Sequence, residues 1–146
     1  MATNLDGAID IARPLSEVFR FVTDATNDVR WQPTVRTSES SPPGRWGAGT
    51  RVVQARRFAG LRFKTHWEIV SAEPDRLVRS RLSGLLVRGD GEYRFSEVPG
   101  GTRFQMTVDA RPRWFVAPLE PLVRGRARLE VPTSLSRLKS AMEATR

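Results

Sequence analysis

LRFKTHWEIV, residues 61–70, alternates strictly between two kinds of side chain. Successive side chains of an extended strand point to opposite faces. One face is formed by Leu61, Phe63, Thr65, Trp67 and Ile69. The other is formed by Arg62, Lys64, His66, Glu68 and Val70, and it includes the only histidine of the chain. The pattern predicts an antiparallel sheet with an aromatic buried face and a charged face in water.

Composition indicates one globular unit. The chain has 146 residues, of which 39% are hydrophobic and 27% are charged. A chain of this length buries roughly 68–70% of its unfolded surface, enough for one core, so we expect a single domain over residues 1–146. No run approaches the roughly 18 apolar residues of a membrane helix, and MATNLDGAIDIARP does not have the pattern of a secretory signal. We therefore expect a cytoplasmic protein.

The chain contains no cysteine. Disulfides, thiolate nucleophiles, iron–sulfur clusters and cysteine-based zinc sites are thereby excluded, and a single histidine forms no histidine cluster. We predict no metal and no cofactor. Any chemistry depends on carboxylates, arginines, hydroxyls or Tyr93.

The net charge is +8 and the sequence pI is about 11.4. Apart from Lys64 and Lys139, the basic residues are arginines, and they are scattered along the chain. We interpret them mainly as a solvated surface. An anionic partner such as nucleic acid is the less favoured interpretation.

The N-terminal region predicts a strand followed by two short helices. Alternation from residue 4 to Ile11 indicates the strand. Pro14 suits a first helical turn, and apolar residues recur at helical spacing until Val22. Asp24 is expected to cap a second short helix that runs toward Trp31.

Six further strands fit between clusters of turn-forming residues, one of which is Gly89-Asp90-Gly91. Their expected ranges are about 34–40, 49–58, 61–71, 76–83, 91–97 and 102–111. The strands at 49–58 and 76–83 alternate poorly, so their inner faces stay undecided.

A long helix is predicted after Pro112, with Pro118 and Pro121 inside its first turn. One side carries the stripe Phe115, Leu119, Leu122, Arg126 and Leu129. A second stripe, about half a turn away, consists of Val131, Leu135, Leu138 and Met142. We expect a kink at Pro132 that lets both stripes face the sheet.

Several motifs occur in a family-like order: Ile11-x-x-Pro14-x-x-x-Val18-Phe19, Trp46-Gly47-x-Gly49-Thr50-Arg51-Val52, Trp67-Glu68-Ile69, Gly91-x-Tyr93-x-Phe95 and Gly100-Gly101-Thr102-Arg103-Phe104. Over nearly its whole length the chain resembles the START-related helix-grip superfamily, which includes polyketide cyclases/dehydrases and lipid-transport-like proteins. The resemblance implies an α+β fold with a seven-stranded antiparallel sheet curved around a long C-terminal helix. It also implies a cavity between them for a hydrophobic ligand.

The residues predicted to line such a cavity are mainly aromatic, with core filling as the alternative for each. They are Trp31, Phe63, Trp67, Tyr93, Phe95, Phe104, Met106, Phe115, Leu119, Leu122 and Arg126. Tyr93 and Arg126 are the weak catalytic candidates, as a proton donor and as a partner for a ligand carboxylate or phenolate. A buried structural phenol and a snorkelling arginine are the corresponding alternatives. Trp31 either gates the cavity or anchors its helix.

Other polar or glycine patterns are interpreted as structural. His66 lies on the outer face, where we expect no catalytic role. Asp24 and Asp28 stand four residues apart, and we attribute them to capping and solvation. Gly44, Gly47 and Gly49 precede a strand rather than a helix, so they are turn and bulge residues rather than a phosphate loop.

Three functions remain open from the sequence. The first is binding, transport or sensing of a small hydrophobic molecule such as a lipid, a quinone or an aromatic polyketide. The second is a cofactor-independent polyketide cyclase or dehydratase that uses the same cavity. The third is an RNA- or ribosome-associated module, since Arg62, Lys64, Arg94, Arg103 and Arg111 lie on the outer face, interspersed with acidic residues. The oligomeric state, monomer or dimer, also stays open.

Overall fold

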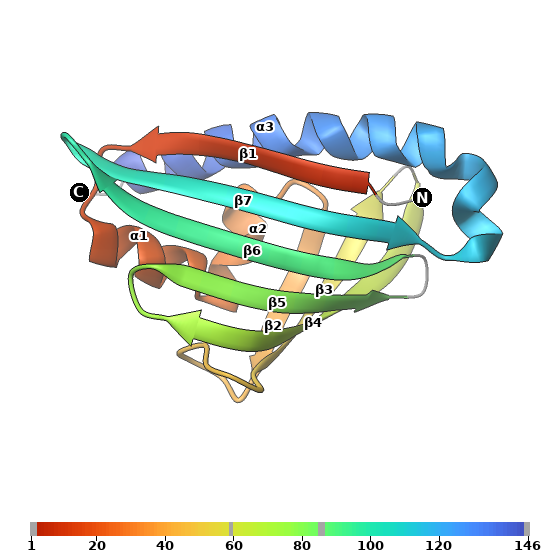
Figure 1. Cartoon of the computed structure of the whole chain (residues 1–146), viewed down its shortest axis with the longest axis horizontal. Helices are drawn as coiled ribbons and strands as arrows, with labels where there is room; N and C mark the ends of the chain where they lie inside the picture. Colours follow the sequence, from red (N-terminus) through yellow and green to blue (C-terminus); the bar gives the residue numbers. More distant parts are fainter. Residues whose placement is uncertain (1–2, 59, 85–86, 145–146) are drawn as a thin grey trace.

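The computed structural model describes residues 3–58, 60–84 and 87–144. Its strands are β1 (Thr3–Ile11), β2 (Val35–Ser41), β3 (Arg51–Phe58), β4 (Leu61–Glu73), β5 (Leu77–Gly84), β6 (Val87–Val98) and β7 (Gly101–Pro112). Its helices are α1 (Leu15–Val22), the short 3-10 helix η1 (Ala25–Asn27), α2 (Asp28–Trp31), the 3-10 helix η2 (Trp114–Leu119) and α3 (Glu120–Ala144). The strands form one antiparallel sheet in the order β1-β7-β6-β5-β4-β3-β2, which confirms the predicted α+β architecture (Figure 1).

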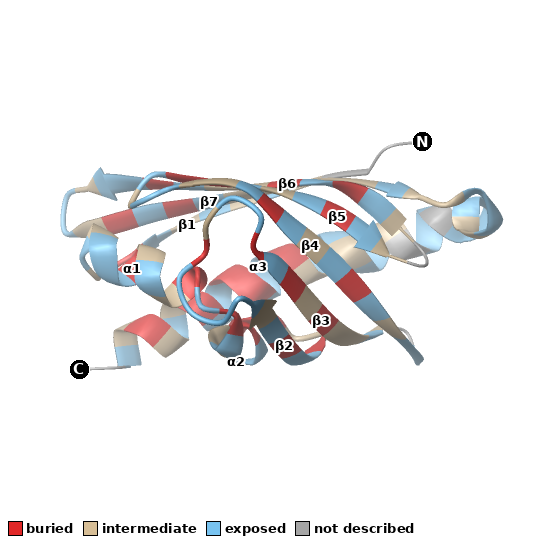
Figure 2. Ribbon diagram, turned by 90° about the horizontal axis from the view of Figure 1, so that it is seen from below, coloured by how far each residue is buried: buried red, intermediate tan, exposed pale blue. Residues whose placement is uncertain are grey.

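The molecule has two layers, with the curved sheet on one side and the helices on the other (Figure 2). The alternation in β4 is as predicted except at its first residue, since Leu61 is 57% exposed. Thr65 and Ile69 are buried, while His66 and its outer-face neighbours are exposed. None of the helices within the described ranges is long and apolar enough to cross a bilayer.

The space beneath the sheet is packed at one end by α1, α2 and the C-terminal half of α3. Aromatic rings dominate this core: Phe19 meets Phe95 with ring centroids 5.0 Å apart, and Trp31 meets Phe104 at 5.9 Å. The second helical stripe, Val131, Leu135, Leu138 and Met142, is buried as predicted. At the other end of the sheet, among the elements that the structure describes, only α3 and η2 lie beneath the strands (Figures 1 and 2).

The end of α3 is fixed to the end of β1 by polar contacts. Lys139 Nζ donates to the Asp10 carbonyl at 2.8 Å and pairs with Glu143 at 2.7 Å. Glu143 in turn accepts the backbone N–H of Ala12 at 2.9 Å. Because Val131 and Leu135 also lie close against Gly7 of β1, the C-terminal half of the helix is held firmly against the sheet.

The structure corrects two expectations about elements. Gly89-Asp90-Gly91 is not a turn, because β6 runs through it from Val87 to Val98. A Cβ at Gly89 would lie 1.9 Å from the Asp109 carbonyl oxygen, and one at Gly91 would lie 2.8 Å from the Trp67 ring, so these glycines permit close packing.

The first helical stripe is also only partly right. Phe115 and Leu119 belong to η2 rather than to the long helix, and both are exposed. Leu129 is on α3 but is 71% exposed, facing away from the sheet. The helix continues through Pro132, and Thr133 Oγ1 bonds the Leu129 carbonyl beside the proline at 3.1 Å.

Candidate functional site

A cavity of about 500 Å³ lies between the open end of the sheet and the N-terminal half of α3. Its apolar wall comes from β1, β3 to β7, η2 and α3. That wall is formed by Leu5, Phe58, Leu61, Phe63, Trp67, Leu82, Val87, Met106, Val108, Ala110, Pro112, Val116, Leu119, Leu122, Ala127 and Val131. Its volume falls within the range of small-molecule sites, about 300–1,000 Å³.

Polar side chains gather on the side of the cavity where α2 meets α3. Arg56 of β3 is at their centre. Its Nη1 donates to Thr34 Oγ1 at 2.7 Å, its Nη2 donates to Gln32 Oε1 at 2.8 Å, and its Nη1 lies 3.6 Å from a Glu130 carboxylate oxygen. Glu130 also accepts from Thr34 Oγ1 at 2.5 Å. The positive charge of Arg56 is therefore neutralised within the cavity wall.

Gln54 links this group to a second, deeper layer. Its Oε1 accepts from Arg56, Thr65 Oγ1 and, at 3.0 Å, Trp67 Nε1. Its Nε2 donates to Asp28 Oδ2 at 2.9 Å. Gln54 thus fixes the indole of Trp67, a wall residue, to a buried carboxylate behind the wall.

Asp28 is 1% exposed, so its interpretation as a solvated side chain was wrong. Ser38 Oγ and Gln54 Nε2 both donate to Oδ2, while Oδ1 has no hydrogen-bond partner within the described residues. Burial raises the pKa of Asp28 to about 6, against the lowering effect of these two hydrogen bonds and of Arg56. Asp24, its neighbour along the chain, instead caps η1 by accepting the Thr26 N–H, as predicted.

Tyr93 and Ser134 contribute hydroxyl groups to the cavity wall. The Tyr93 hydroxyl makes no hydrogen bond to any residue that the structure describes, and the same holds for Ser134 on α3. Burial raises the pKa of Tyr93 well above its usual value, and the negative charge of Asp28 adds to this effect. The phenol is therefore a neutral hydrogen-bond donor at ordinary pH.

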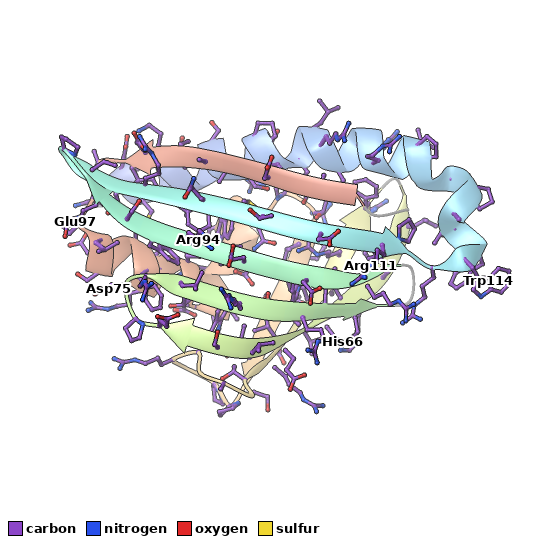
Figure 3. All side chains as sticks on the ribbon, in the orientation of Figure 1. His66, Asp75, Arg94, Glu97, Arg111 and Trp114 are labelled. Carbon is purple, nitrogen blue, oxygen red and sulfur yellow. The ribbon has the colours of Figure 1, made fainter. Side chains whose placement is uncertain are left out.

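The structure brings together seven of the eleven predicted cavity residues. They are Phe63, Trp67, Tyr93, Met106, Leu119, Leu122 and Arg126, the last an exposed side chain at the rim. Trp31, Phe95 and Phe104 lie in the packed core instead, where Trp31 anchors its helix. Phe115 is outside the cavity and packs against Trp114 with ring centroids 5.7 Å apart. His66 points outward from β4, away from the cavity (Figure 3).

Sequence reasoning missed the polar side of the cavity, including Gln32, Thr34, Arg56 and Glu130. The polar residues at inner positions of β3 obscured its alternation. The sequence did contain a signal for the inner face of β3, because only two residues separate Phe58 from Leu61. That short connection pairs Arg56 with Phe63 and Gln54 with Thr65, and so places both on the inner face.

Comparison with known proteins matches the chain to a protein family. The family model described as "Polyketide cyclase / dehydrase and lipid transport" matches residues 2–143. Among curated proteins, no significant match was found.

Solved structures share the fold at low sequence identity. A START superfamily protein from Mycobacterium smegmatis superposes with a TM-score of 0.79 at 13% identity, over 98% of this chain and 99% of that chain. The Zhui aromatase/cyclase from Streptomyces sp. R1128 gives a TM-score of 0.79 at 17% identity, over 98% and 94% of the two chains. A protein from Thermus thermophilus gives 0.79 at 21% identity, over 98% and 99%. At these identities the likeness establishes the fold.

Proposed function

Because the chain belongs to the polyketide cyclase / dehydrase and lipid transport family, we propose that it binds a small, largely apolar molecule in the cavity between the sheet and α3. The observation that carries this proposal is the cavity itself. Its volume is about 500 Å³, and its wall is mostly apolar, with polar side chains on the side nearest α2 and Arg124 and Arg126 contributed by α3. If the side chains of the wall only filled a core, no such space would remain, since protein interiors are close-packed.

The proposed ligand has at least one hydrogen-bond acceptor, such as a carbonyl oxygen. Arg56 donates to Gln32, Thr34 and Gln54, so it offers little to a ligand without breaking these bonds. Tyr93 and Ser134 are the cavity residues whose hydroxyls have no described partner. A carbonyl bonded to Tyr93 would fix the orientation of an otherwise apolar molecule.

Calorimetric titration with menadione, which has two carbonyls, and with the hydrocarbon 2-methylnaphthalene tests this proposal. We expect saturable binding of both probes and tighter binding of menadione. Tyr93→Phe should weaken menadione binding by about 3–10-fold, the value of one hydrogen bond, and leave 2-methylnaphthalene unaffected. Absence of saturable binding for both probes would contradict the proposal.

A reaction on a bound carbonyl compound is the second candidate function. It is favoured by the presence of a neutral phenol, Tyr93, and a carboxylate, Glu130, in one cavity. Cyclisation with loss of water needs a base to remove a carbon-bound proton and a donor to the carbonyl oxygen. We expect wild-type protein to accelerate water loss from a short linear polyketone, followed by mass spectrometry. Tyr93→Phe and Glu130→Gln should then lose turnover, and a wild-type rate equal to that in buffer would exclude this function.

A further inference from the structure

The cavity opens at one end of the molecule through an unusually apolar surface. We call Leu61, Trp114, Phe115, Leu119 and Leu122 the apolar rim. These are five of the eight large apolar side chains that are exposed in the described part of the chain, and Trp114 is 86% exposed. Leu61, Leu119 and Leu122 also line the cavity, so the rim and the cavity wall are continuous.

The rim projects from the body of the protein. Figure 2 shows η2 and the start of α3 as a mostly exposed turn at one extremity. Figure 3 places Trp114 at the outermost point of this turn, beyond the end of β7. A protruding indole is accessible to a flat surface and does not form a groove for a polypeptide.

Arginines flank this end in an unusual arrangement. Arg57 of β3 lies directly opposite Arg62 of β4, one position from Phe58 and Leu61 at the cavity mouth. Arg88 of β6 lies opposite Arg111 of β7, beside Val87 and Pro112. Like charges directly opposite each other destabilise a sheet unless an anion compensates them.

Elsewhere on the outer face, several arginines lie opposite acidic residues. Arg103 opposes Asp10 and bonds it at 2.8 Å, and Arg79 opposes Glu92 at 3.3 Å. Arg111 reaches back to Asp90 at 3.5 Å. Arg57, Arg62 and Arg88 have no ion pair within the described residues, although all three are exposed.

We propose that the apolar rim docks this protein on the surface of an anionic lipid bilayer. Trp114 and its apolar neighbours enter the headgroup region, where tryptophan is favoured, and Arg57, Arg62 and Arg88 contact lipid phosphates. The inference deepens the proposed function, because it names the phase with which the cavity exchanges an apolar ligand. An acidic protein partner would satisfy the arginines, but it would leave the protruding Trp114 without a hydrophobic environment.

The test is binding of the full chain to phosphatidylcholine vesicles with and without phosphatidylglycerol. We expect sedimentation with the anionic vesicles only, weakening steeply from about 0.05 M to about 0.5 M salt. Trp114 should be quenched by brominated lipid, and Trp114→Ser should remove that quenching. Arg57→Ser/Arg62→Ser should weaken vesicle binding by at least about tenfold, since each surface arginine contributes about fivefold.

Arg20→Ser/Arg137→Ser is the matched control, because it lowers the net charge equally with two exposed arginines on α1 and on the C-terminal half of α3. Equal weakening by both double variants would reduce the effect to net charge and overturn the proposal. The proposal would also be overturned if the wild-type protein does not bind anionic vesicles but binds soluble polyglutamate through Arg57 and Arg62. None of these variants alters a cavity residue, so menadione titration of the same proteins reports separately on the proposed function.

Discussion

At the scale of single residues, the burial of the Asp28 carboxylate costs free energy of folding. Asp28 is buried with one carboxylate oxygen bonded by Ser38 and Gln54 and the other without a described partner. Burial of a carboxylate disfavours its charged form. Gln54 bonds both this carboxylate and the indole of Trp67. The buried carboxylate therefore helps to hold Trp67 in its place in the cavity wall.

Replacing Asp28 with asparagine should remove a pH dependence of stability. The pKa of Asp28 is raised from 3.8 to about 6 in the folded protein, so the folded state binds a proton more tightly than the unfolded chain. This contribution to stability is complete below pH 3.8 and is lost as the pH rises through about 6. Relative to Asp28→Asn, the wild type should therefore lose about 2–3 kcal/mol between about pH 4 and about pH 7, measured by urea denaturation. A constant difference between the two proteins would contradict the assigned shift.

Gln54 is the residue on which most of the polar network depends. Gln54→Leu removes the acceptor of Trp67 Nε1 and Arg56 and the donor to Asp28. We expect a loss of about 2–4 kcal/mol in the free energy of unfolding, because buried polar groups are left without partners. Gln105→Leu on the exposed face of β7 is the matched control and should change stability by less than about 0.5 kcal/mol. Similar losses in both variants would show that the network contributes no special stability.

At the scale of elements, alternation and proline positions were sufficient to predict most strands and helices. These signals failed at β6, because the sequence alone does not show whether a glycine forms a turn or permits close packing within a strand. Gly89 leaves room for the Asp109 backbone on β7, and Gly91 leaves room for the Trp67 ring on β4. The local sequence does not encode these contacts. The inner face of β3 was missed for a related reason, because the partners of its polar residues lie on α2, β4 and α3.

Gly89→Ala should test this account of β6. The added Cβ would overlap the carbonyl oxygen of Asp109, which is backbone and has little freedom to move. We expect a loss of about 1–3 kcal/mol in unfolding free energy. Gly47→Ala is the control, since a Cβ at that position would have nothing within 4 Å and its φ is not in the left-handed region. If both substitutions are tolerated equally, the turn interpretation of residues 89–91 regains support.

At the scale of the whole molecule, the fold divides into a packed half and a hollow half. The two short helices and the C-terminal half of α3 fill the space under one end of the sheet, while α3 and η2 are the described elements that cover the other end (Figure 2). The sequence predicted a cavity through a resemblance, but it did not separate the residues of the two halves. Phe95 and Phe104 share the inner face with Tyr93 and Met106, and only the position of the helices decides which of them face open space.

Filling the hollow half should therefore remove ligand binding without damaging the packed half. Ala127 lies on α3 and lines the cavity, so Ala127→Phe places a ring in the space proposed for the ligand. We expect menadione affinity to fall at least about tenfold while stability rises by about 1 kcal/mol through added apolar burial. Ala8→Phe, on the exposed face of β1, is the matched control and should leave menadione binding unchanged. Full menadione affinity in Ala127→Phe would place the ligand elsewhere, whereas lost affinity with retained stability assigns binding to the hollow half of the fold.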